Sequence, residues 1–200
     1  PEGKKGYGLT VYHKQADPFG LPGVHSLIFQ YAKDAATLRG AGFLGETRSR
    51  NDWMLFNHWI FDPKTTPLPI SGTLSVGIRR GKIDDPIAGE TKVKEAWAGV
   101  RPQYHITNIW SLMSELGYQQ LKVDGEDGTR KLAKITVGTQ VSMGRSVWSR
   151  PAIRFYATYA KWNTAAAQGG TVVCTGRDCG RAVPEYNFNP VTGAAGERKG

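Results

Sequence analysis

The stretch SVWSRPAIRFYATYAKWN, residues 146–163, carries the clearest fold signal in the chain. From Ile153 onward, apolar residues alternate with polar or small ones. One side carries Ile153, Phe155 and Tyr159, and the other carries Arg154 and Thr158. Successive side chains of a β-strand point to opposite faces, so this period of two predicts a strand with one apolar and one mixed face. Trp148, just before the strand, has the parity of Arg154, which predicts that it lies on the mixed face.

The same alternation recurs along the chain and predicts eight strands. They lie near residues 6–14, 24–33, 52–61, 72–80, 94–106, 111–121, 131–141 and 151–162. Each has about the 9–11 residues that a tilted strand needs to cross a bilayer. In TLSVGIRR, for example, Leu74, Val76 and Ile78 face away from Ser75 and Arg79. The segment 52–61 is apolar on both faces, so the pattern does not orient it.

The lengths of the connections indicate how these strands are joined. Long connections are expected at 34–51, 81–93 and 163–200, and shorter ones after the first, fifth and seventh strands. Short turns at one end and long loops at the other are typical of an antiparallel up-and-down transmembrane β-barrel in an outer membrane. We predict this all-β fold. Apolar and polar residues also alternate in the strands of a soluble β-sandwich, where the polar face lies in water. Alternation alone therefore leaves that alternative open.

Composition and charge narrow the classes of function. The 200 residues carry a formal net charge of +9, which favours an anionic partner. However, Lys and Arg are scattered along the chain, whereas a nucleic-acid surface gathers basic residues with exposed aromatics on one face. The four histidines belong to no metal-binding or nucleophile motif. We therefore predict no nucleic-acid partner, no metal, no cofactor and no enzymatic activity.

The chain has two cysteines, Cys174 and Cys179, in the stretch VCTGRDCG. Four intervening residues, with Gly176 and Asp178 among them, form a tight turn that a disulfide closes in an oxidising compartment. We predict this disulfide, with two free thiols as the alternative.

The stretch 146–163 also resembles a segment near the carboxyl end of maltoporins, the trimeric sugar-specific porins of bacterial outer membranes. Further stretches resemble the same family in the same order: LIFQYAKD (27–34), WAGVRPQYHIT (97–107), SELGYQQ (114–120) and GRAVP (180–184). The resemblance implies a barrel of about 18 strands. We expect this chain to be a fragment from the carboxyl-terminal half, holding about eight of them. Residues 1–200 then belong to a single porin domain, with 163–200 as a long extracellular loop.

The resemblance also implies a sugar-binding track. Maltoporins line their pore with aromatic residues, on which the apolar face of a sugar ring slides, flanked by polar groups for its hydroxyls. Trp148 matches one position of the track. A second position, aromatic in the family, falls at Val24, which shares parity with Ser26 and Gln30. This departure removes one stacking surface near the periplasmic exit. The alternative for Trp148 is a place in the aromatic girdle at the membrane interface.

Charged residues in the middle of the predicted strands are candidate channel groups. A charge on the lipid face near the midplane costs roughly 2–4 kcal/mol, so these side chains are expected to point inward. They are Arg79, Arg101, Glu115, Lys134 and Arg154. The alternative for each is a wall network of paired charges without sugar contact. Phe29, Tyr31, Phe155 and Tyr159 are assigned to the lipid face.

The resemblance implies a sugar-selective porin that moves maltose or maltodextrin-like oligosaccharides by facilitated diffusion. The expected partners are these sugars, two further copies in a homotrimer, and outer-membrane lipid with lipopolysaccharide. The alternatives are a general or anion-favouring porin, a porin for another disaccharide such as sucrose, and a soluble carbohydrate-binding β-sandwich.

Overall fold

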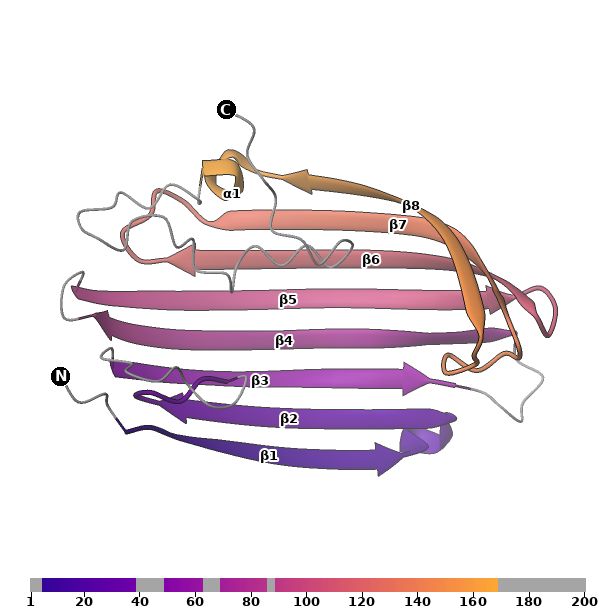
Figure 1. Ribbon diagram of the computed structural model, residues 1–200, viewed down its shortest axis with the longest axis horizontal. Helices are drawn as coiled ribbons and strands as arrows, with labels where there is room; N and C mark the ends of the chain where they lie inside the picture. The colour runs from indigo at the N-terminus through magenta and orange to yellow at the C-terminus, as the bar shows by residue number, and fades with distance from the viewer. Residues whose placement is uncertain (1–4, 39–48, 63–68, 86–88, 169–200) are drawn as a thin grey trace.

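A computed structural model describes residues 5–38, 49–62, 69–85 and 89–168 (Figure 1). Its elements are β1 (Tyr7–Ala16), η1 (Pro18–Gly20), β2 (Gly23–Lys33), β3 (Ser49–Phe61), β4 (Ile70–Asp85), β5 (Gly89–His105), β6 (Trp110–Val123), β7 (Arg130–Ser142), β8 (Ala152–Trp162) and α1 (Thr164–Gln168). No helix in these ranges is long and apolar enough to cross a membrane.

The eight strands form one antiparallel sheet in the order β1-β2-β3-β4-β5-β6-β7-β8. Each strand pairs with the next one along the chain (Figure 1), which is the up-and-down topology. The predicted fold class and all eight predicted strands are therefore confirmed. The ends at which β1 is followed by β2, β3 by β4, β5 by β6 and β7 by β8 form one end of the sheet, here called the Trp148 end. The ends at which β2 is followed by β3, β4 by β5 and β6 by β7 form the opposite end.

The prediction of a long connection at 81–93 is wrong. β4 continues to Asp85 and β5 begins at Gly89, so only residues 86–88 join them. The apolar face ends near Ile78, but the alternation continues in charged residues. Glu90 bridges the Lys82 and Lys92 ammonium groups across the strand pair. Cross-strand ion pairs thus extend the ladder beyond the apolar residues.

The two faces of the sheet differ in chemistry. One, the apolar face, carries exposed large side chains: Leu74, Val76, Ile78, Val100, Leu112, Leu116, Tyr118, Ile135, Val137, Ile153, Phe155 and Tyr159. The other, the polar face, carries Ser71, Ser75, Arg79, Gln103, Glu115, Lys134, Gln140 and Arg154. Phe29, Tyr31, Phe155 and Tyr159 all lie on the apolar face, as expected for lipid-facing residues.

Pairing with β4 orients β3, which the sequence pattern left open. Leu55 lies opposite Ile78 on the apolar face, whereas Met54 lies opposite Arg79 on the polar face. Both faces of β3 are apolar, so its orientation comes from the register rather than from its own residues.

The sheet curves so that the polar face is concave. Residues 143–151 join β7 to β8, yet Ser146 and Val147 reach Asp62, beyond the end of β3. In Figure 1 the β7 and β8 ends that carry this connection bend across toward the level of β3 and β4. Beneath it, Ser71, Gln103, His105 and Ser111 of the polar face are buried. On the apolar face at the same end, Tyr104 and Val141 are exposed.

The carboxyl-terminal segment is described only at its start. After β8 the chain forms the short helix α1, Thr164–Gln168. Residues 169–200, which hold most of the predicted extracellular loop, lie outside the described residues. So do Cys174 and Cys179, and their disulfide stays a prediction.

Candidate functional site

The connection between β7 and β8 is held by one carboxylate. The Ser146 hydroxyl donates a hydrogen bond to Asp62 Oδ2 at 2.7 Å. The backbone N–H of Val147 donates to Asp62 Oδ1 at 3.4 Å. Asp62 follows β3 directly and is only 7% exposed. The sequence reasoning missed Asp62, since a contact across 84 positions leaves no local pattern.

Trp148 lies within this anchored connection. Its backbone N–H donates to the Ser146 hydroxyl at 3.2 Å, next to the bond from Ser146 to Asp62. The Arg150 guanidinium closes the turn by donating to the carbonyl oxygens of Val147 and Ser149. The Trp148 side chain is 63% exposed. An accessible indole therefore stands on a fixed turn at one end of the concave face.

The parity argument for Trp148 does not hold. β8 begins at Ala152, and residues 143–151 form bends and turns rather than extended strand. The period of two applies only to extended backbone, so the parity of Arg154 says nothing about Trp148. Its association with the polar face rests instead on the hydrogen bonds from its neighbours Ser146 and Val147 to Asp62.

Val24 lies on the polar face, as its parity predicted. It is the second residue of β2, opposite Ala16 of β1 and Ile60 of β3. Ser26 and Gln30 follow on the same face. The start of β2 belongs to the Trp148 end, so Val24 and Trp148 share one end of the sheet. Valine offers an apolar surface there, but no ring.

Three charged groups form a ladder across β5, β6 and β7. Arg101 Nε lies 3.4 Å from Glu115 Oε2, and Lys134 Nζ lies 2.6 Å from Glu115 Oε1. Arg101 remains 42% exposed. On β8, Arg154 Nε donates to Gln140 Oε1 at 2.6 Å, and the Gln140 amide donates to the Ser142 hydroxyl. The structure thus places four of the predicted residues side by side on the polar face. This group, here called the charged strip, consists of Arg101, Glu115, Lys134 and Arg154.

Arg79 belongs to a second, more buried network. Its guanidinium donates to Asp52 Oδ2 at 2.8 Å and lies 3.9 Å from Glu95 Oε2. Arg50 lies 3.6 Å from the same Asp52 oxygen. Gln119 donates to Glu95, which continues the network to β6. This arrangement matches the wall network of paired charges that was the alternative for Arg79.

Two aromatic side chains on the polar face escaped the sequence reasoning. Trp97 lies directly opposite Gly77, and a Cβ at Gly77 would come within 2.2 Å of the indole. The ring therefore covers the glycine and lies against the wall. Phe56, also opposite Gly77, has its ring centroid 6.5 Å from that of Trp97. A glycine across from a tryptophan in the register is the signal that could have found this pair.

The buried end of the polar face is satisfied by neutral hydrogen bonds. The Ser71 hydroxyl lies 2.8 Å from His105 Nε2, and the Gln103 amide donates to the Ser111 hydroxyl at 2.6 Å. Within the described ranges, no three His, Cys, Asp or Glu side chains gather in a way that would hold a metal ion.

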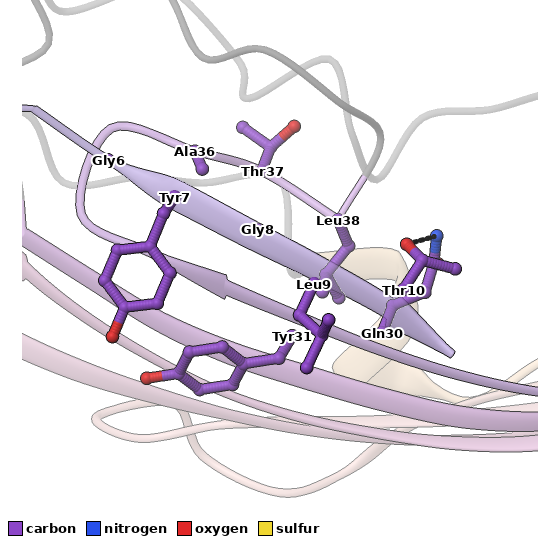
Figure 2. Close-up of a pocket in the computed structure, with 10 residues that line it drawn as sticks. All are labelled: Gly6, Tyr7, Gly8, Leu9, Thr10, Gln30, Tyr31, Ala36, Thr37 and Leu38. Carbon is purple, nitrogen blue, oxygen red and sulfur yellow. Dashed lines mark hydrogen bonds between the residues drawn. The ribbon is translucent and has the colours of Figure 1, made fainter.

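A pocket of about 770 Å³ lies elsewhere, at the edge strand β1 (Figure 2). Its lining comes from both faces of the sheet. Tyr7, Leu9 and Tyr31 belong to the apolar face, whereas Thr10 and Gln30 belong to the polar face. A hollow that wraps around a sheet edge offers no single binding surface. We therefore place the candidate site on the polar face between the Trp148 connection and the Arg101 ladder.

Comparison with models of protein families adds an independent finding. Residues 1–185 match the family described as LamB porin. The matched range includes all eight strands, the Trp148 connection and every charged residue of the two networks.

Proposed function

The chain belongs to the LamB porin family, the maltoporins, and on this premise we propose that its polar face lines a channel for maltose and maltodextrins. At the level of the family, LamB porins are sugar-selective β-barrel channels of the outer membrane rather than enzymes. The substrate, the residues that bind it and the assembly are the parts that we propose for this chain.

The exposed indole of Trp148 on its anchored turn carries the proposal. A sugar ring has apolar C–H groups on its faces and hydroxyls around its rim. The indole offers a flat apolar surface for the ring face, and a fixed turn limits the entropy lost on binding. Transport is then facilitated diffusion: the sugar binds weakly, moves between sites and leaves down its concentration gradient.

The hydroxyls of the sugar are assigned to the charged strip. Arg101, Glu115 and Arg154 offer donors and acceptors at the wall, and Arg101 remains 42% exposed. Hydrogen bonds in which one partner is charged are stronger than those between neutral groups. Arg79 contributes to the wall. Val24 contributes an apolar contact without stacking, which weakens the site for long linear chains.

We further propose how the channel is oriented in the membrane and how it assembles. The apolar face lies against outer-membrane lipid, and the Trp148 end lies on the periplasmic side, with lipopolysaccharide around the opposite end. Three copies assemble as a homotrimer. The predicted disulfide between Cys174 and Cys179 belongs to the extracellular loop.

An anion-favouring pore is the second candidate, and the charge of the strip favours it. Arg101, Lys134 and Arg154 supply three cations, with Glu115 as the carboxylate between them. Such an excess raises the local concentration of anions. A pore for a neutral sugar does not need a preference for anions.

Reconstituted protein distinguishes the two candidates. Liposomes that contain it are expected to swell faster in maltose and maltotriose than in sucrose, because the binding site favours linear glucose chains. In a planar bilayer with a salt gradient, the reversal potential is expected to show only weak selectivity. Equal swelling rates for the sugars, together with a strong chloride preference, would replace sugar selectivity with anion diffusion.

A further inference from the structure

A row of like charges crosses the apolar face at the end opposite Trp148. Arg80 of β4 lies directly opposite Lys94 of β5, and Lys94 lies directly opposite Lys122 of β6. All three side chains are exposed. Like charges in directly opposite positions destabilise a sheet, so this row needs a counter-ion.

The described part of the chain does not supply that counter-ion. Arg80, Lys94 and Lys122 form no ion pair within it. In the next row outward, Lys82 and Lys92 are bridged by Glu90, and Asp84 follows Lys82 on the same face. On this face of the described parts of β4, β5 and β6, five cations therefore meet two carboxylates, and the row nearest the apolar band contains no carboxylate.

A pocket coincides with this surface. It has a volume of about 260 Å³, and its side-chain lining comes from Asn51, Trp53, Arg80, Lys82, Lys92 and Lys94. These six side chains share the outer face of β3, β4 and β5. Trp53 lies directly opposite Arg80, so an aromatic ring borders the cations. The pocket thus combines positive charge with one flat apolar wall.

The pocket lies at the position along the strands where the head groups of membrane lipids are expected. Leu74, Val76 and Ile78 form the apolar band of β4, and Arg80 is the next residue on the same face. Two residues of a strand span about 6.6 Å, so the cations begin where the hydrocarbon ends. Aromatic side chains such as Trp53 are enriched at this interface.

From these observations we propose that the pocket binds the phosphate groups of lipopolysaccharide in the outer leaflet. The inference rests on the proposed function for its orientation, which puts this end of the sheet on the outside. Basic clusters beside a membrane bind anionic head groups, and each cation contributes to the attraction. Lipopolysaccharide carries more than one phosphate on a sugar backbone. That chemistry suits a pocket with several cations and a flanking indole.

The test uses the purified protein in detergent and measures binding to three probes: lipopolysaccharide, lipopolysaccharide stripped of its lipid A phosphates, and phosphatidylglycerol. Arg80→Gln/Lys94→Gln removes two pocket cations. Lys131→Gln/Lys161→Gln is the matched control, because it removes the same charge from the apolar face of β7 and β8. The pocket variant is expected to bind intact lipopolysaccharide about tenfold more weakly than the wild type. The control is expected to bind like the wild type.

Removing the phosphates from the probe is expected to weaken wild-type binding by a similar factor, which makes the test independent of how well a variant folds. Equal binding of intact and stripped lipopolysaccharide would overturn the proposal. Phosphatidylglycerol that binds as tightly as lipopolysaccharide would overturn the choice of lipid. Sugar-dependent swelling measured on the same variants keeps the two proposals separate, since the pocket faces away from the channel.

Discussion

Asp52→Ala is expected to lower the free energy of unfolding by about 3–5 kcal/mol, the cost of removing one partner from a buried ion pair. Asp52 is 1% exposed, and its Oδ2 contacts both the Arg79 and the Arg50 guanidinium groups. Arg50 is 6% exposed and Arg79 13% exposed, so water cannot replace the lost carboxylate. Urea unfolding of the protein in lipid vesicles measures the change.

Glu90→Gln is the control for this prediction. Glu90 also pairs with two cations, Lys82 and Lys92, but all three side chains are at least 40% exposed. Water and salt screen such a pair, so its removal is expected to leave the unfolding transition unchanged within error. Equal losses in Asp52→Ala and Glu90→Gln would show that burial does not govern the strength of these networks.

Trp148→Ala is expected to raise the maltotriose concentration that half-blocks the ion current by about tenfold. Covering one face of an indole with a sugar ring contributes about 1–2 kcal/mol. The open conductance without sugar should change little, because the residue lies on a turn at one end of the sheet. Trp148→Phe keeps a flat ring and is expected to recover most of the block. Unchanged block in Trp148→Ala would remove this residue from the sugar path.

Asp62→Ala tests whether sugar binding depends on the position of the Trp148 indole as well as on its presence. The substitution leaves Trp148 in place but removes the acceptor for the Ser146 hydroxyl and the Val147 N–H. A released turn is expected to weaken the sugar block while the conductance fluctuates more. A conductance as quiet as that of the wild type, with unchanged block, would show that Asp62 does not position Trp148.

The sequence predicted the sheet well because period-two alternation is strong in β4 to β8. In β4, Leu74, Val76 and Ile78 alternate with Ser75 and Arg79, and the structure separates these residues to opposite faces. The prediction was incomplete or wrong where apolar and polar residues do not alternate. The orientation of β3 follows only from its pairing with β4. Residues 81–85, GKIDD, were predicted as a loop although they continue β4.

The candidate site was less predictable because it depends on contacts between distant residues. The charged ladder followed from strand parity and lies on one face as expected. Trp148 lies on a turn, where parity has no meaning, and its anchor Asp62 is 84 positions away. Trp97 and Phe56 were missed because the glycine that makes room for the indole, Gly77, belongs to a third strand.

The central claim is that the polar face lines a water-filled channel and the apolar face meets lipid. Cysteine labelling of two consecutive residues in β4, with Cys174 and Cys179 replaced by serine, tests it most directly. Ser75 lies on the polar face and Val76 on the apolar face. In membranes, a charged, membrane-impermeant thiol reagent is expected to label Ser75→Cys rapidly and to leave Val76→Cys unlabelled. Labelling of Val76→Cys at a rate equal to or above that of Ser75→Cys would contradict the claim.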